Sequence, residues 1–277
     1  MPDRRVTVRP ITAKVSRVGS PPAIDASRPN VARVYDYLLG GKDNFESDRA
    51  LGDQIIAALP AAQDGVRAQR EVLARVVRFL VGDEHVTQLL DIGSGLPTAE
   101  NVHQVAQAVD PRCDVVYVDN DPVVVSHARA LLDDSEHTFA AAGDLRDPAG
   151  IIAAAGKHLD WTRPVGLLLC GIVHFLPDEE APHRLVTGLI DALPAGSYVF
   201  IHHLLHTEDV TLEAAMKRGL GQVQFRTREQ ILALFAGLDL VDPGLVLVPD
   251  WRPGPSTPRV RDHPVLALAV AGVARKP

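Results

Sequence analysis

Four short apolar runs, separated by stretches with helical spacing, follow one another after residue 83. They lie at 88–92, 115–118, 165–170 and 198–201. Fully buried strands read as continuous apolar runs, and strands that alternate with helices pair in parallel. Two later runs, at 240–248 and 265–273, have only a Pro-rich loop between them, so we expect them to pair antiparallel. The sequence therefore predicts an α/β protein with a doubly wound, mostly parallel sheet that finishes in an antiparallel strand.

The chain divides into three expected parts. Residues 1–29 combine basic residues with several prolines and predict an N-terminal arm, either flexible or clasped against the protein. Residues 30–82 carry apolar residues at helical spacing, with a helix N-cap expected at Ser47 and a helix start at Asp64, and predict a helical cap. Residues 83–277 contain the apolar runs and predict the domain that carries the sheet.

Charge and cysteine content exclude several classes of partner and location. The chain has 28 Lys and Arg against 35 Asp and Glu, and its net charge of −7 has the wrong sign for attracting nucleic acid. Cys113 and Cys170 lack the spacing of a zinc site or a disulfide framework, so we expect free thiols and a cytoplasmic location. The longest apolar run, 165–176, is shorter than the ~18 to 20 residues of a membrane helix, so no membrane association is expected.

An acidic residue and a glycine turn end the first apolar run. Asp91 is followed by Gly93, Ser94 and Gly95, and a helix is expected to begin near Thr98. Glycine permits positive φ and lets a ligand contact the backbone, while a helix N-terminus offers unpaired N–H groups. The turn therefore suits a nucleotide-like ligand. A dinucleotide site would have a third glycine at position 98, so NAD is disfavoured.

Further carboxylates follow the next two strands. Asp119, with Asn120 beside it, lies 24 residues beyond Gly95, a spacing that suits hydrogen bonds to both hydroxyls of a ribose. Asp144 follows a strand expected at 137–142 and could accept from an adenine amino group. Each glycine or carboxylate alone could be an ordinary turn or helix cap, but the ordered set favours a ligand. Three carboxylates would repel a pyrophosphate and suit the cationic S-adenosylmethionine.

At these residues the chain resembles a class I S-adenosylmethionine-dependent methyltransferase. Segments 31–45, 91–98 and 116–122 are, more narrowly, similar to the actinobacterial domain-of-unknown-function family assigned to these methyltransferases, and the resemblance runs from about residue 30 to the C-terminus. It implies a Rossmann-like, seven-stranded sheet with an antiparallel last strand, and S-adenosyl-L-methionine as the cofactor. The cofactor-binding residues expected from motif and resemblance together are Asp91, Gly93, Ser94, Gly95, Thr98, Asp119, Asn120, Asp144, Leu145, Cys170 and Gly171.

Three side chains are candidate proton acceptors for catalysis. His174 lies in a segment similar to the His-bearing segment of many small-molecule methyltransferases, and its ordinary pKa of ~6.5 is near working pH. His203, next to His202 after the fifth strand, and Tyr37 are the others. Each histidine could instead pack under the cofactor or line the site. No third ligand residue lies nearby in sequence, so no metal is expected.

Residues 35–45 form a polar and aromatic segment ahead of the sheet. We expect it to act as a lid or an acceptor wall that hinges at its two glycines, the alternative being a helix C-cap followed by a solvated turn. The residues assigned to this role are Tyr35, Gly40, Gly41, Lys42, Asp43 and Asn44.

The function expected from the sequence is methyl transfer from S-adenosylmethionine to a small-molecule O or N acceptor. Two alternatives stay open: a non-catalytic protein that senses the cofactor or binds a partner, and an NAD-dependent oxidoreductase. Transfer of label from the cofactor would distinguish the methyltransferase from the sensor. Titration against NADH would test the oxidoreductase. The sequence specifies neither the acceptor nor an oligomeric state.

Overall fold

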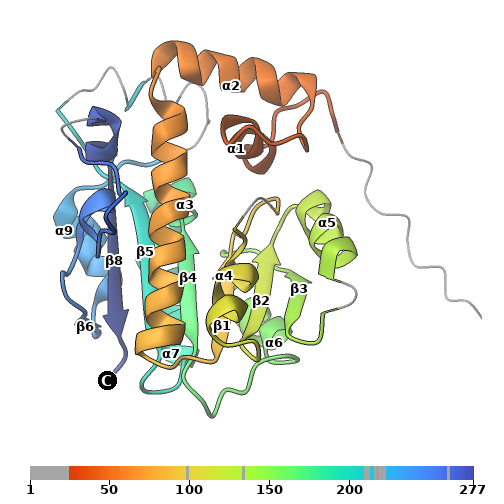
Figure 1. The fold of residues 1–277 in the computed structure, drawn as a ribbon, viewed down its shortest axis with the longest axis vertical. Coiled ribbons are helices and arrows are strands. Elements are labelled where there is room, and N and C mark those ends of the chain that lie inside the picture. The colour runs from red at the N-terminus through yellow and green to blue at the C-terminus, as the bar shows by residue number, and fades with distance from the viewer. Residues whose placement is uncertain are drawn as a thin grey trace, which may run out of the picture.

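A twisted mixed sheet flanked by helices forms the centre of the computed structural model (Figure 1). The structure describes residues 25–97, 100–132, 135–208, 213–214, 217, 223–260 and 263–277. Most of the expected N-terminal arm and Thr98 lie outside these residues. Within the described part of the chain, no helix is long and apolar enough to cross a membrane.

The sheet has the order β3-β2-β1-β4-β5-β8-β6, with β7 also paired to β8. Its first five strands are parallel: β1 (Gln88–Ile92), β2 (Asp114–Asp119), β3 (Thr138–Ala142), β4 (Gly166–Cys170) and β5 (Tyr198–Leu204). The C-terminal strand β8 (Ala269–Arg275) runs antiparallel to β5 and lies between β5 and β6. The predicted doubly wound sheet with an antiparallel finish is confirmed.

The number of strands differs from the seven that the resemblance implied. The run at 240–248 forms two short strands, β6 (Asp239–Leu240) and β7 (Val246–Leu247), and the described sheet has eight strands. Pro243 has no amide hydrogen to donate, and Gly244 has a φ of +83°, so the chain turns between the two strands. The run expected at 265–273 begins instead as a short 3-10 helix at Pro264–Leu268.

Helices cover both faces of the sheet. One face carries α3 (Ala62–Arg78) and α4 (Val102–Val109), and the other carries α6 (Pro148–Ala155) and α7 (Pro182–Ala192). Two further helices of the described residues are α5 (Pro122–Leu132) and α9 (Arg228–Leu232). Alternate strand residues point to opposite faces, which divides the core into two apolar clusters. Leu89, Val115, Leu168 and Phe200 belong to the first cluster, and Leu90, Val116, Leu167 and Val199 to the second.

The N-terminal helices α1 (Val31–Leu38) and α2 (Glu46–Ala58) lie at one end of the sheet, with α2 across the top of the view and α1 beneath it, beside the upper part of α3 (Figure 1). A buried carboxylate holds them together. Asp48 is fully buried and accepts hydrogen bonds from the Arg33 Nε at 2.7 Å and from the backbone N–H groups of Asn30 and Phe45, both at 2.8 Å. The N-cap predicted at Ser47 is therefore two residues late: Phe45 holds that position, and Asp48 accepts its N–H from inside the first turn.

Both cysteines are free thiols. Cys113 is buried just before β2 and Cys170 ends β4, and β1 lies between these two strands.

We expect Asp48→Ala to lower the free energy of unfolding by about 3 to 5 kcal/mol, because the buried Arg33 guanidinium loses its counter-ion. Urea denaturation measures this change. The matched control is Asp53→Ala on the same helix, since Asp53 accepts from the Tyr37 hydroxyl on the exposed surface. A loss for Asp48→Ala no larger than that of the control would contradict the structural role assigned to this ion pair.

Candidate functional site

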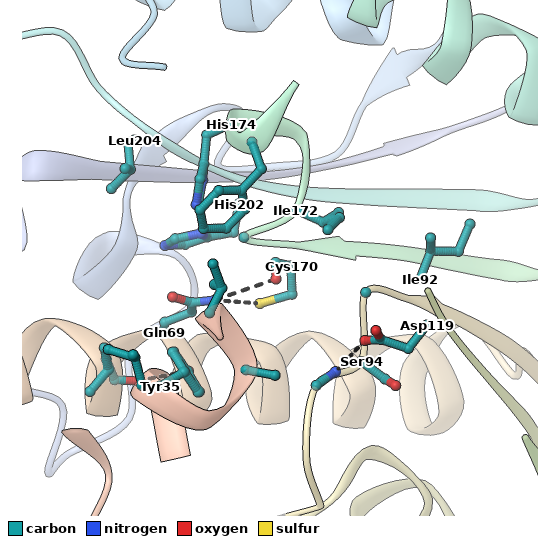
Figure 2. Close-up of a pocket in the computed structure, with 18 of the residues that line it drawn as sticks. Tyr35, Gln69, Ile92, Ser94, Asp119, Cys170, Ile172, His174, His202 and Leu204 are labelled. Carbon is teal, nitrogen blue, oxygen red and sulfur yellow. Dashed lines mark hydrogen bonds between the residues drawn. The ribbon is translucent and has the colours of Figure 1, made fainter. Parts of the chain in front are cut away.

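A cavity of about 410 Å³ opens where the five parallel strands end. Its walls come from α1, α3, the loops that follow β1 to β5, and the segment 265–269. Figure 2 shows Asp119 and Ser94 toward one end of this cavity and His174 and His202 toward the other. The first end, which also holds Asp91, is rich in carboxylates, whereas the second is mainly apolar.

The glycine turn after β1 has the conformation that its sequence predicts. Gly93 and Gly95 have φ values of +72° and +67°, a region that favours glycine. A Cβ on Gly93 would lie 2.7 Å from the Ile172 side chain, so the loop after β4 also requires a glycine there. The Gly95 N–H donates to Asp119 Oδ2 at 2.9 Å, which ties the turn after β1 to the end of β2.

The carboxylates after β2 and β3 are linked in the same way. Asp119 also accepts the Asp121 N–H at 2.9 Å, and burial raises the pKa of its carboxyl group. Asn120 donates to Asp144 Oδ2 at 3.1 Å. Burial alone would raise the pKa of Asp144, but the hydrogen bonds from the Arg146 N–H and Asn120 outweigh it and leave the pKa below its usual value. Three consecutive strand ends thus form one connected polar wall, with the largely buried Leu145 beside it.

Asp91 is the most deeply buried of the three carboxylates. Asp91 is only 4% exposed, and burial raises the pKa of its carboxyl to about 7. The negative charge of Asp119 makes a smaller contribution in the same direction. The guanidinium of Arg70, on α3, opposes this shift. Arg70 also donates to the Glu100 carbonyl at 3.0 Å. Asp91 and Arg70 therefore bring an acid and a cation to the same end of the cavity.

Gln69, next to Arg70 on α3, reaches the end of β4. Its Nε2 lies 3.4 Å from the Cys170 carbonyl oxygen and 3.6 Å from the Cys170 Sγ (Figure 2). Burial raises the pKa of the Cys170 thiol to about 12, so it stays protonated at neutral pH. Gly171 has a φ of +74° and leaves room for the Gln69 amide. Neither Gln69 nor Arg70 was predicted from the sequence, where they read as ordinary polar positions of a helix.

Two histidines line the apolar end of the cavity. His174 lies on a 3-10 turn, Val173–Phe175, and His202 on β5, with ring centroids 6.5 Å apart. The two residues are only 6% and 3% exposed, and the Nδ1 atom of each has no hydrogen-bond partner among the described residues. Burial lowers the pKa of His202 to about 4 and, with the neighbouring His203, His202 and Arg226, lowers that of His174 well below its usual value. Both rings are neutral at pH 7.

His203 points away from the cavity, so its prediction as a proton acceptor there is corrected. Its Nδ1 lies 2.8 Å from the Leu204 carbonyl oxygen, and its Nε2 lies 2.9 Å from Arg226 Nη1. The carbonyl and the guanidinium require Nδ1 to donate and Nε2 to accept, which occupies both ring nitrogens. Successive residues of a strand face opposite sides of a sheet, so only one of two adjacent histidines can reach the cavity. That residue is His202.

Tyr37 is also placed elsewhere. Its hydroxyl donates to Asp53 Oδ1 at 2.6 Å on the exposed surface of the helical cap, and it does not line the cavity. Tyr35, two residues earlier, does line the cavity, and its hydroxyl donates to the Val66 carbonyl at 3.3 Å. Burial raises the pKa of the Tyr35 hydroxyl, so it remains protonated.

The expected lid residues after Tyr35 form a turn around a buried carboxylate. Asp36 Oδ2 accepts the Asp43 N–H and the Asn44 Nδ2, both at 2.9 Å. A Cβ on Gly41 would lie 1.9 Å from Asp36 Oδ1, so the glycine serves close packing. The remaining two, Gly40 and Lys42, likewise do not line the cavity. The structure corresponds to the alternative interpretation of a helix C-cap and turn.

Comparison with known families and structures gives a consistent result. A family model described as S-adenosyl methyltransferase matches residues 18–277. A Thermobifida fusca YX protein assigned as a methyltransferase is 42% identical, with a TM-score of 0.86, over 94% of this chain and 99% of that one. A DUF574 family protein from Streptomyces avermitilis MA-4680 is 36% identical, with a TM-score of 0.86, over 91% of this chain and 99% of that one.

More distant structures share the fold alone. The magnesium protoporphyrin IX methyltransferase ChlM from Synechocystis PCC 6803, solved with S-adenosylhomocysteine, is 14% identical with a TM-score of 0.54, over 88% of this chain and 93% of that one. Comparison with curated proteins gives no match. The family match extends over nearly the whole chain, which therefore belongs to the S-adenosyl methyltransferase family and is a methyltransferase with S-adenosyl-L-methionine as its cofactor.

Proposed function

We propose that the methyl acceptor is a small molecule, methylated on oxygen or nitrogen, that binds in the apolar part of the cavity. The observation that carries this proposal is the continuity of the cavity, which joins the strand-end carboxylates to an apolar chamber walled by α1, α3 and the segment 265–269. Its volume of about 410 Å³ is in the range of small-ligand sites. A chamber walled by apolar side chains suits a compact acceptor better than a nucleic acid or a protein surface.

The carboxylate-rich end is the proposed cofactor site. Asp144 and Leu145 would contact the adenine, and Asp119 would accept both ribose hydroxyls. Asp91 and Arg70 carry opposite charges, which match the ammonium and the carboxylate of the cofactor's amino acid group. Gly93 and Gly95 let the ligand approach the backbone between them. The residues present thus fit each chemical part of the cofactor.

When bound, S-adenosylmethionine supplies a methyl group attached to a positively charged sulfur. That sulfur is a good leaving group because it becomes a neutral thioether when the methyl group is transferred. The protein then has to align the acceptor with that methyl group and exclude water. Leu38, Leu73, Ile172 and Leu176 provide apolar walls for this purpose. The neutral ring of His174 is the proposed proton acceptor, because its low pKa keeps a nitrogen lone pair free at working pH.

Methyl transfer is tested by incubating the purified protein with S-adenosylmethionine labelled in its methyl group and a cell extract divided by size. We expect label in the low-molecular-mass fraction. Label confined to protein or nucleic acid would contradict a small-molecule acceptor. Cofactor binding without any transfer would instead favour the non-catalytic alternative.

Two substitutions distinguish the ends of the proposed cofactor site. We expect Arg70→Met to weaken binding of S-adenosylhomocysteine by at least tenfold, because it removes a charge-assisted hydrogen bond worth about 1.5 to 3 kcal/mol. It should not change the affinity for 5′-methylthioadenosine, since that ligand has no amino acid group. Asp119→Ala should weaken the binding of both ligands. Calorimetry measures the four affinities, and equal effects of Arg70→Met on the two ligands would contradict its assignment.

The raised pKa of Asp91 predicts a pH dependence of binding. Burial favours the neutral form of the Asp91 carboxyl. Its contribution to the stability of the fold is therefore complete below pH ~4 and is lost as the pH rises through about 7. A bound ammonium favours the ionised form, so affinity for S-adenosylhomocysteine should increase between pH 5.5 and 7.5. Asp91→Asn should bind weakly and lose this part of the increase. Calorimetry over this range checks the difference, and parallel pH profiles would exclude Asp91 as the ammonium ligand.

A further inference from the structure

The acceptor end of the cavity has a distinctive set of polar groups. Its polar side chains are the Tyr35 hydroxyl, the Gln69 amide and the rings of His174 and His202. The charged side chains among the described lining residues lie at the cofactor end: Arg70, Asp91, Asp119, Asp121, Asp144 and Arg146. No carboxylate among the described residues is therefore placed to neutralise a cationic acceptor at the histidine end.

The two histidines still have unused hydrogen-bonding capacity. Tyr35 already donates to Val66, and Gln69 is directed at Cys170. By contrast, His174 and His202 each have a buried Nδ1 without a partner in the described part of the chain. A neutral imidazole has one donor and one acceptor nitrogen. Two such rings, 6.5 Å apart between centroids, suit a group that both donates and accepts.

A buried cation behind the histidines adds to this preference. Arg226 is 4% exposed and donates to the Leu176 carbonyl at 2.7 Å and the Val173 carbonyl at 3.3 Å, which holds the turn that carries His174. It also pairs with Asp178 at 2.7 Å, whose side chain is 67% exposed to solvent and screened accordingly. The positive charge of Arg226 disfavours protonation of His174 and would likewise disfavour a bound ammonium group.

We propose that the acceptor is an uncharged, largely apolar molecule methylated on a hydroxyl group that His174 and His202 bind together. This inference rests on the proposed small-molecule function and specifies its substrate class. The hydroxyl oxygen forms a bond to the methyl carbon as the carbon–sulfur bond breaks, with the electron pair of that bond staying on sulfur. The sulfur loses its positive charge in this step, which offsets the charge of the proton that the hydroxyl group gives to a ring nitrogen of the pair and that then passes to solvent.

An amine acceptor fits the same site less well. Alkyl amines are protonated at neutral pH, so they would enter as donor-only cations next to neutral rings and in the field of Arg226. A hydroxyl group enters uncharged, can accept from one ring and donate to the other, and needs a proton acceptor when its oxygen is methylated. Both requirements are met by the two imidazoles.

The test compares 2-naphthylmethanol with 2-naphthylmethylamine, which share a skeleton and differ only in the hydroxyl or amino group. A phenol, 2-naphthol, is the third compound. Ligand-observed NMR measures binding to the protein saturated with S-adenosylhomocysteine, and labelled S-adenosylmethionine measures transfer. We expect the hydroxyl compounds to bind and to be methylated in preference to the amines. Preference for the amines, or no binding by any hydroxyl compound, would overturn the proposal. Failure of S-adenosylhomocysteine itself to bind would instead overturn the proposed cofactor site.

Substitutions then test the histidine pair. His174→Gln and His202→Gln should each reduce transfer to the best hydroxyl compound at least tenfold at pH 7, with S-adenosylhomocysteine affinity changed less than twofold. The control is His183→Gln, at an exposed position of α7. With a phenol, the His174→Gln rate should recover as pH approaches the phenol's own pKa of about 10, since solvent then removes the proton. Rates equal to wild type in both variants would exclude the pair.

Discussion

The hydrogen bond from the Gly95 amide to the Asp119 carboxylate is the contact on which the rest of the site depends. It holds the turn after β1 against the end of β2, and Asn120 continues the connection to Asp144 after β3. A parallel sheet brings these strand ends to one edge, which places three carboxylates around a single space. Burial raises the pKa of Asp91 and Asp119, so ionising either carboxyl at this edge has a free-energy cost. A cationic ligand relieves this cost.

Helix α3 connects this site to the N-terminal helices. One side of α3 packs into the core of the sheet through residues such as Val72, Val76 and Val77. Gln69 and Arg70 on the same helix reach β4 and the neighbourhood of Asp91. The Arg33–Asp48 ion pair in turn holds α2 against α1, which lines the cavity. The cavity is therefore built jointly by the N-terminal helices and the sheet.

The sequence predicted the residues whose position follows from the strands themselves. Asp91 and Asp119 lie at the carboxyl ends of β1 and β2, and Asp144 follows β3, so their convergence can be inferred from the order of the strands alone. Arg70 and Gln69 could not be found in this way, because nothing local indicates which side of α3 faces the strand ends. The sequence could not show which of His202 and His203 faces the cavity, because both faces of the sheet are buried and β5 is apolar on both sides. The hydrogen bonds from the turn at 40–44 to Asp36 could not be predicted either, because sequence spacing does not reveal that contact.

The chemical division of the cavity is the central claim, with cofactor groups at the carboxylate end and the acceptor at the histidine end. A crystal structure of the protein with S-adenosylhomocysteine tests it most directly. The account predicts ribose hydroxyls within hydrogen-bond distance of Asp119, the amino acid group between Asp91 and Arg70, and the sulfur facing the space beside His174 and His202. A ligand bound with its sulfur turned away from the two histidines, or with its ribose remote from Asp119, would contradict the account.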